Sequence, residues 1–154
     1  MRLVTCRNSI LAFLFFCLLG CGRVDPDHPP KIHYGRDVCD ECGMIISEKQ
    51  FAAASVDRDG NITKFDGIGC LILYQAKHPS AVQWNWVHDY QSEEWIEVDN
   101  AFFVNTEKLV TPMAFGLVAF SSKRVASQFV HEEGGALVEL NELPAIVQKK
   151  VERV

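Results

Sequence analysis

The chain has 154 residues, of which 48% are hydrophobic and 23% charged, and its formal net charge is −5. This length is enough for one hydrophobic core but not for two independent ones. The acidic balance excludes a general nucleic-acid binder, because neutralising phosphates requires an excess of Lys and Arg.

The first residues predict an export signal that ends at a lipidation site. An uncharged apolar run over residues 10–20 follows two arginines and is shorter than a membrane-spanning helix. Its end, Leu-Leu-Gly-Cys, is similar to the lipobox of bacterial lipoproteins, so we expect residues 1–20 to be removed and Cys21 to carry the lipid. Gly22 resembles the residue of lipoproteins sorted to the outer membrane, where an aspartate would indicate inner-membrane retention. An ordinary secretory signal or a membrane anchor is the alternative.

Cleavage would change both the charge and the number of thiols. Loss of the two arginines leaves 13 basic residues against 20 acidic ones, so the net charge falls to −7. Two of the six cysteines leave with the signal and a third is lipidated, so Cys39, Cys42 and Cys70 remain. Because three thiols cannot form a complete set of disulfides, at least one of them needs another role.

The mature chain predicts a tether followed by one α+β domain. Residues 21–36 are rich in proline and are expected to form a flexible tether, and residues 37–154 the domain. In the first half of the domain, about 37–91, the sequence pattern predicts a hairpin, then a helix, then a strand. Its elements in chain order are a hairpin over 51–65 with its turn at 59–61, a helix over 67–78 capped by Asp66, and a strand over 82–90.

The second half, about 92–154, repeats this order and adds a terminal helix. Ser121 or Ser122 is expected to cap its first helix, which ends at Gly134. We therefore predict two similar ββαβ-type halves in one compact domain, plus a C-terminal helix. The predicted elements are strands over 94–99, 101–105 and 115–120, a helix over 122–133, a strand over 136–140 and a helix over 142–154.

Two thiols and a thioether, Cys39, Cys42 and Met44, lie within six residues. A redox pair usually opens a helix, but Gly43 and the β-branched residues after it do not favour a helix start. A structural zinc site usually has two close ligand pairs, whereas only one exists here, and Cys70 and His88 lie far away in sequence.

A soft-metal site is the third interpretation and the one the residues favour. Cu(I) prefers thiolate and thioether ligands, and Gly43 lets the backbone fold tightly around an ion. The second mature methionine, Met113, follows Pro112, which favours an extended or turn segment rather than a helix. We expect Cys42 as thiolate to be the anionic anchor, with Met44 and Met113 tuning the affinity.

Four separated motifs resemble the accessory lipoproteins of nitrous oxide reductase, the NosL family. The resemblance covers about residues 39–130 and is specific because the motifs agree in order and spacing. They are Cys-Gly-Met at 42–44, FDGIGCLILY at 65–74, VHDYQSEEWIEVDNAFFV at 87–104 and TPMAFGLVAFSS at 111–122.

The resemblance implies a periplasmic copper chaperone on the outer membrane, not an enzyme. It implies two ββαβ halves, one bound Cu(I), and delivery to an ABC-type transporter and its periplasmic partner. The implied ligands are Cys42, Met44 and Met113. Many relatives lack a cysteine at the position of Cys39, so this thiol is an extra ligand, a resolving thiol or a bystander.

The remaining candidates have simpler explanations. Cys70 and His88 are expected to be buried side chains, and helix capping and turn formation explain the two motif aspartates, Asp66 and Asp89. A thiol–disulfide redox protein using Cys39 and Cys42 is the alternative function.

Overall fold

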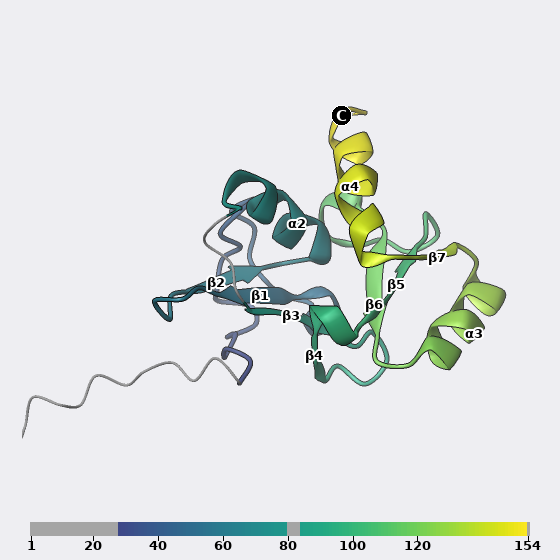
Figure 1. Cartoon of the computed structure of the whole chain (residues 1–154), viewed down its shortest axis with the longest axis horizontal. Helices are drawn as coiled ribbons and strands as arrows, with labels where there is room; N and C mark the ends of the chain where they lie inside the picture. Colours follow the sequence, from purple (N-terminus) through teal and green to yellow (C-terminus); the bar gives the residue numbers. More distant parts are fainter. Residues whose placement is uncertain (1–27, 80–83, 154) are drawn as a thin grey trace, which may run out of the picture.

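The computed structural model describes residues 28–79 and 84–153 (Figure 1). The predicted signal peptide, Cys21 and the start of the tether lie outside the described residues. Within the described part of the chain, none of the helices is long and apolar enough to cross a membrane.

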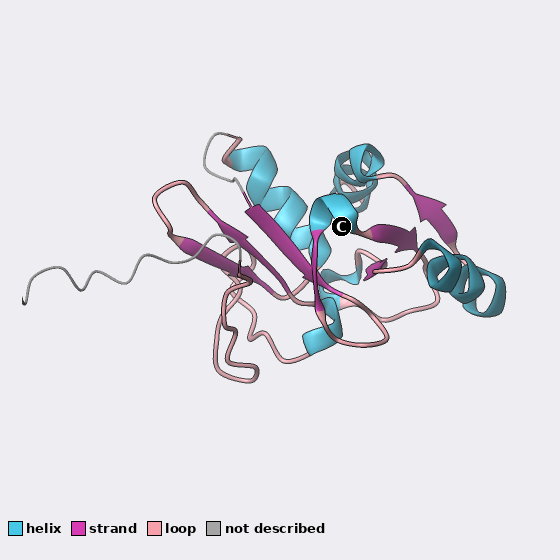
Figure 2. Ribbon diagram, turned by 60° about the horizontal axis from the view of Figure 1, so that its bottom comes forward, coloured by secondary structure: helices cyan, strands magenta, loops and turns pink. Residues whose placement is uncertain are grey.

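The first half forms a four-stranded antiparallel sheet with the strand order β2-β1-β3-β4. Helix α2 (Ile68–Lys77) lies against it, as Figures 1 and 2 show from two directions. The Asp57 carboxylate closes the β1–β2 turn by accepting hydrogen bonds from the backbone N–H groups of Asp59 and Asn61. The strands are β1 (Ala53–Val56), β2 (Ile62–Phe65), β3 (Trp84–His88) and β4 (Trp95–Glu97).

The second half forms a three-stranded antiparallel sheet with the order β6-β5-β7. Helix α3 (Lys123–Glu133) packs on its outer face and ends at Gly134, whose φ of +84° suits a helix C-terminus. Helix α4 (Leu143–Val151) follows β7 and contacts α2. The strands are β5 (Phe102–Asn105), β6 (Leu117–Phe120) and β7 (Ala136–Val138), and short 3₁₀ helices are η2 (Lys49–Phe51), η3 (Val98–Asn100), η4 (Pro112–Ala114) and η5 (Leu140–Glu142).

The predicted α+β fold with two similar halves is confirmed by the strand order. In each half the first strand is central, the second strand pairs on one side, and the strand after the helix pairs on the other. Strand β4 is an addition to this plan. The sequence-based division at residue 92 assigns β4 to the second half, whereas it hydrogen-bonds to β3 in the first sheet.

Two apolar cores hold these layers together. The larger core lies between the first sheet, α2, the inner face of the second sheet and α4, and it includes Leu71, Phe103 and Leu143. The smaller one lies between α3 and the outer face of the second sheet, where Phe120 and Phe129 contact each other. Since α4 buries its apolar side on α2, the C-terminal helix seals the larger core.

Asp89 joins the two sheets directly after β3. Its backbone forms a parallel bridge with Ala119 of β6. One carboxylate oxygen accepts hydrogen bonds from the N–H and the hydroxyl of Ser121, both at 2.7 Å. The other accepts from the N–H groups of Gln91 and Ser92, each at 2.9 Å. The predicted turn role of Asp89 therefore holds, and the same side chain also fixes one half against the other.

Three sequence-based expectations need correction. The tether ends earlier than residue 36, because Ile32 is buried in the core and Tyr34 packs against it. Asp66 does not cap α2, whose N-cap position is Gly67 and lacks a side-chain cap bond. Neither predicted serine caps α3: Ser122 occupies the N-cap position without a side-chain cap bond, and the Ser121 hydroxyl donates to Asp89.

Candidate metal centre

The segment 37–46 folds back on itself as a tight loop that presents its sulfurs. Val38 and Ile45 form an isolated antiparallel bridge. Inside it, the Cys39 N–H donates to the Met44 carbonyl at 2.8 Å and the Gly43 N–H donates to the Cys39 carbonyl at 2.9 Å. Gly43 has a φ of +76°, a conformation that glycine adopts without strain. As expected, this Cys-x-x-Cys segment does not open a helix.

Polar contacts with β2 hold this loop in place. The Lys64 N–H donates to the Asp40 carboxylate at 2.7 Å, and the Asp40 N–H donates back to the Lys64 carbonyl at 2.9 Å. The Lys64 ammonium also pairs with Asp37 at 2.6 Å. The loop is therefore fixed on the strand that leads directly into the β2–α2 corner.

That corner adds two further potential ligands to the loop. Cys70 lies in the first turn of α2, and Asp66 lies between β2 and α2. The sulfurs of Cys39, Cys42 and Cys70 and a carboxylate oxygen of Asp66 all lie within 4.8 Å of one another. We call these four residues the inner cluster. Three thiols and a carboxylate this close together form a ligand set suited to a thiophilic metal ion.

Asp66 is a buried carboxylate, and one of its oxygens has no hydrogen-bond partner among the described residues. The side chain is only 3% exposed. One oxygen accepts a hydrogen bond from the Cys42 thiol at 3.3 Å. Among the described residues the other oxygen, Oδ1, is buried without a hydrogen-bond partner. Burying an unpaired polar atom is costly, so this oxygen favours a cation close by.

The three thiols differ in their readiness to ionise. The hydrogen bond from Cys70, together with backbone N–H donors, lowers the pKa of Cys39 to about 6 despite its burial. Burial, followed by the effect of neighbouring Cys39 and Asp66, raises the pKa of Cys42 to about 11. The hydrogen bond to Cys39, burial and Asp66 raise the pKa of Cys70. Of the three thiols, Cys39 therefore has the pKa that most favours the thiolate.

Beside the inner cluster lies a groove that brings the two methionines together. The groove has a volume of about 240 Å³, and Met44, Met113 and Asp66 are among its lining residues. Met44 is 48% exposed and Met113 is 49% exposed, so both thioethers remain accessible from solvent. We call this the methionine groove. Asp66 belongs to its wall and also contacts Cys42, so the groove adjoins the inner cluster.

The second-half wall of this groove is held by an unusually close packing contact. Phe115 is buried, and a Cβ on Gly69 would lie 2.0 Å from its ring. The Gly116 N–H donates to the Thr111 hydroxyl at 2.8 Å and closes the loop. Within it Met113 has a φ of +54°, which is strained for a residue with a side chain. The strain is maintained because Phe115 and Thr111 fix both sides of the methionine.

His88 has no free ring nitrogen for a metal. Its Nε2 accepts a hydrogen bond from the Tyr34 hydroxyl at 2.7 Å, and its Nδ1 donates to the Glu93 carbonyl at 2.8 Å. Burial lowers its pKa to about 4, so the ring is neutral near pH 7. The Trp95 ring lies over it, with 3.7 Å between centroids. His88 is a buried structural residue.

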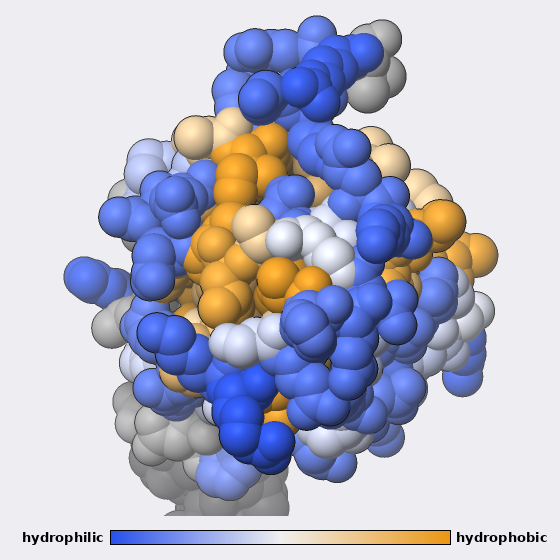
Figure 3. Space-filling view, turned by 90° about the vertical axis from the view of Figure 1, so that its right-hand side faces the viewer, coloured by the Kyte–Doolittle hydropathy of each residue, from blue (hydrophilic) through white to orange (hydrophobic). Residues whose placement is uncertain are grey.

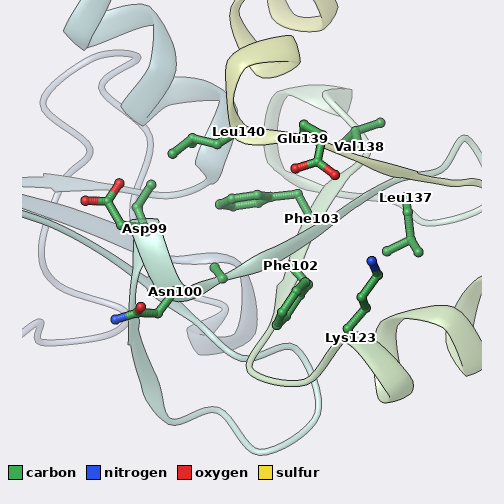
Figure 4. A pocket seen from close by; sticks show the side chains of 11 residues that line it. Asp99, Asn100, Phe102, Phe103, Lys123, Leu137, Val138, Glu139 and Leu140 are labelled. Atoms are coloured by element: carbon green, nitrogen blue, oxygen red, sulfur yellow. The ribbon is translucent and has the colours of Figure 1, made fainter.

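A second, larger groove lies elsewhere on the molecule and has different chemistry. It measures about 570 Å³, and the described residues that line it include no cysteine, methionine or histidine. Figure 4 shows the rings of Phe102 and Phe103 beside Leu137 and Leu140, with Lys123 reaching in from α3. On the side of the molecule where β7 and α4 lie, Figure 3 shows apolar surface bordered by hydrophilic residues. This groove lacks soft ligands, so we place the metal chemistry at the smaller one.

Sequence reasoning found four sulfur residues of this region but missed how the fold completes it. Cys42 and Cys39 lie in the inner cluster, and Met44 and Met113 line the adjoining groove. Cys70 and Asp66 were assigned to burial and to helix capping. The available signal was their place in the chain: Asp66 directly precedes α2 and Cys70 lies in its first turn. Side chains at such a strand–helix corner can face a neighbouring loop and add ligands to it.

Comparison with known proteins gives a family match and a structural match that agree with each other. The family model described as NosL matches residues 31–147, well over half of the chain. A solved structure described as "Crystal structure of the copper chaperone NosL from Shewanella denitrificans" is 22% identical, with a TM-score of 0.61. The alignment covers 74% of this chain and 96% of that one, and at this identity it shows the shared fold. The comparison with curated proteins gives no match. On the strength of the family model, the chain belongs to the NosL family.

Proposed function

We propose that this chain is a Cu(I) metallochaperone, a carrier rather than a catalyst. It binds copper with Cys42, Met44 and Met113 and releases it to a protein partner. The family membership supports this function, and the solved relative is itself described as a copper chaperone. The observation that carries the proposal is the methionine groove, since residues 69 positions apart in sequence, Met44 and Met113, line one small space beside Cys42.

The donor chemistry supports Cu(I) over harder ions. Thioether sulfur is a poor ligand for calcium, magnesium or zinc and a good one for Cu(I). Both thioethers are about half exposed, so a partner protein can reach an ion held there. Because Cu(I) accepts two or three ligands, an incoming sulfur can bind before a chaperone sulfur leaves. Copper then passes between proteins without being free in solution.

The destination and the location complete the proposal. The copper goes to the assembly machinery of nitrous oxide reductase, through an ABC-type transporter and its periplasmic partner. The chain is a lipoprotein, anchored through Cys21 to the periplasmic face of the outer membrane. The lipobox-like sequence and Gly22 support this location, and the resemblance of the four motifs supports the destination.

Anaerobic competition with a chromophoric Cu(I) chelator tests the ligand set. The protein for all variants is the full chain in detergent carrying Cys6→Ser, Cys17→Ser and Cys21→Ser, so that three thiols remain. Cys42→Ser is expected to weaken Cu(I) binding by ~100-fold or more and Met113→Leu by ~10-fold or more, since even residues behind a ligand cost 10–100-fold. Ile45→Leu is the matched control, because Ile45 lines the same groove without sulfur.

Two results would contradict the proposal. One is a wild-type chain that loses all Cu(I) to a weak chelator. The other is a Met44→Leu, Met113→Leu double variant that binds as tightly as Ile45→Leu. In the second case copper binds elsewhere and the groove is not the site of exchange.

The alternative, a thiol–disulfide redox protein, has one observation in its favour and one against it. The lowered pKa of Cys39 suits a nucleophilic thiol. However, Cys39 is only 1% exposed, and the more exposed Cys42 has a raised pKa. A redox enzyme needs the ionised thiol at the surface, where a partner disulfide can reach it. Alkylation of the purified protein followed by mass spectrometry separates the two functions. A carrier keeps Cys42 free or metal-bound, whereas a redox protein cycles through a Cys39–Cys42 disulfide that resists alkylation.

A further inference from the structure

The duplicated fold leaves one strand position unfilled in the second half. In each half the strand after the helix, β3 or β7, pairs with the central strand. In the first half β4 then pairs with the other edge of β3, whereas the second sheet ends at β7. Among the described residues, no hydrogen bond other than those to β5 reaches the backbone of β7. The outer edge of β7 is therefore available to a further strand.

The other three edges of the two sheets are covered or charged. The loop 37–46 hydrogen-bonds to β2, the backbone of Asp89 bridges to β6, and Glu97 places a charge in β4. By contrast, residues 134–138, Gly-Gly-Ala-Leu-Val, carry no charge and no proline. Edge strands that lack cover, charge and proline readily accept a strand from another chain. In the described part of the molecule, β7 is the edge with this property.

A groove of about 570 Å³ lies beside β7 and gives room for the side chains of such a strand. Its two walls are the segments 98–103 and 137–140 (Figure 4). Three apolar side chains in these walls, Phe102, Leu137 and Leu140, are each between 36% and 39% exposed. An apolar side chain placed between them would remove this surface from water, which favours binding.

The charges of the groove favour a segment with a basic start. Strand β7 runs towards Glu139, and Asp99 lies in the opposite wall. A strand antiparallel to β7, as β4 is to β3, would start at this acidic end. No ion pair among the described residues includes Asp99, so its carboxylate is available to a cation. The basic residue Lys123 lies on another side of the groove, beside Leu137 (Figure 4).

We infer that the second sheet takes its fourth strand from another protein. The bound segment is extended, pairs antiparallel with β7, starts with a lysine or arginine beside Asp99, and inserts an apolar side chain between Phe102 and Leu140. This inference does not depend on copper, because no residue that lines this groove lines the methionine groove or belongs to the inner cluster. A second copy of the chain fits less well, because pairing two antiparallel β7 strands brings Glu139 of one towards Glu133 of the other.

A synthetic peptide is a suitable probe, because main-chain pairing does not require the partner's own sequence. The peptide Lys-Val-Thr-Phe-Thr-Val-Thr starts with a lysine and alternates apolar and polar residues. Two control peptides carry N-methyl groups on alternate residues, one in each register, so that only one of them loses the N–H groups that face β7. The protein is the full chain in detergent used for the chelator competition.

Fluorescence anisotropy measures peptide binding, and hydrogen exchange shows which amides the peptide protects. We expect saturable binding and protection of residues 136–138. One N-methylated peptide should bind ~10-fold more weakly and the other should bind like the parent peptide.

Three protein variants locate the binding site. Leu137→Lys puts a charge on the open edge and should weaken binding by ~10-fold or more. Ile62→Lys is the matched control, because Ile62 is 38% exposed on the edge strand β2, and it should change binding little. Asp99→Lys should weaken binding of the lysine peptide and strengthen binding of a peptide that starts with glutamate. Unchanged circular dichroism and thermal unfolding show that each variant is folded.

Three results would overturn the inference. The first is the absence of saturable binding. The second is equal binding of both N-methylated peptides, since the groove would then hold side chains without strand pairing. The third is a chain that dimerises by itself in sedimentation and becomes monomeric in Leu137→Lys, because a second copy would then be the occupant.

Discussion

The substitution Gly69→Ala tests how the methionine groove is assembled. Gly69 lies in the first turn of α2, and Phe115 comes from the loop that carries Met113. A Cβ at residue 69 would lie 2.0, 2.2 and 2.7 Å from three ring atoms of Phe115. Ordinary carbon contacts are longer than 3.4 Å, so the ring must move by more than 1 Å. Because Met113 is two residues from Phe115, the methionine should move with it.

The expected cost follows from two opposing contributions. Overfilling a packed core costs about 1–3 kcal/mol, and Phe115 is buried, so the ring has no solvent to turn into. Replacing glycine by alanine inside a helix contributes about 1 kcal/mol in the other direction. The two contributions leave a net cost of ~0–2 kcal/mol, and the 2.0 Å approach to the ring favours its upper half. We therefore expect Gly69→Ala to lower the free energy of unfolding by ~1–2 kcal/mol. For a domain of this size that corresponds to a decrease in Tm of about 2–8 °C.

Urea unfolding followed by circular dichroism measures the change, and chelator competition measures Cu(I) binding in the same variant. Gly67→Ala is the matched control, because its Cβ would meet only the Pro112 side chain at an ordinary 3.6 Å. We expect the control to change both quantities little. A Gly69→Ala protein that is as stable as the parent and binds Cu(I) as tightly would refute the reasoning, since it would mean that the ring does not hold the methionine loop against α2.

Two buried titratable groups, His88 and Asp89, give separate predictions for stability and its dependence on pH. His88→Phe should lower the free energy of unfolding by ~1–3 kcal/mol, because Tyr34 and the Glu93 carbonyl each lose a hydrogen bond. It should leave Cu(I) affinity unchanged, and a weakened affinity would make His88 a ligand. Burial lowers the pKa of His88 from 6.5 to about 4, so as the pH drops through that range the unfolded chain takes up a proton before the folded one, and stability falls. In His88→Phe, the urea midpoint should no longer fall between pH 6.5 and 4 for this reason. Burial alone would raise the pKa of Asp89, but hydrogen bonds from Ser121 and neighbouring N–H groups lower it from 3.8 to about 2. Its contribution of ~2 kcal/mol, present above pH 3.8, should be lost as the pH falls towards 2, and Asp89→Asn should lack that lower phase; an unchanged profile would show that Asp89 does not join the sheets.

The fold could be predicted from the sequence because its signals are local. The Asp-Gly-Asn turn, the apolar run of α2 and the Gly134 helix end each depend on neighbours within a few residues. The duplication could also be inferred, since the order of elements repeats even where the residues differ. The boundaries were less accurate: the strand expected over 94–99 turns into a 3₁₀ helix at Val98, after β4 has ended at Glu97.

The inner cluster could not be predicted in the same way. Local chemistry assigned Asp66 to capping, because an aspartate before a helix usually serves that role. In the structure the loop bearing Cys39 and Cys42 is fixed to β2 by Lys64, which brings it beside the residue that follows that strand. Nothing in the sequence pattern around Asp66 indicates a partner 24 residues earlier in the chain. The two methionines were found because their residue type is rare in the mature chain and copper chemistry selects it.

The inner cluster and the methionine groove differ in which parts of the fold they require. The inner cluster comes entirely from the first half, whereas the methionine groove needs Met44 from the first half and Met113 from the second. The contacts that hold the halves together, Gly69 with Phe115 and Asp89 with Ser121, lie outside both ligand sets. Loosening them should therefore weaken Cu(I) binding in the methionine groove, through the separation of the thioethers, while leaving the inner cluster assembled. If Gly69→Ala loosened the contact between the halves without weakening Cu(I) binding, the ion would be held by the first half alone, and Met113 would not be a ligand.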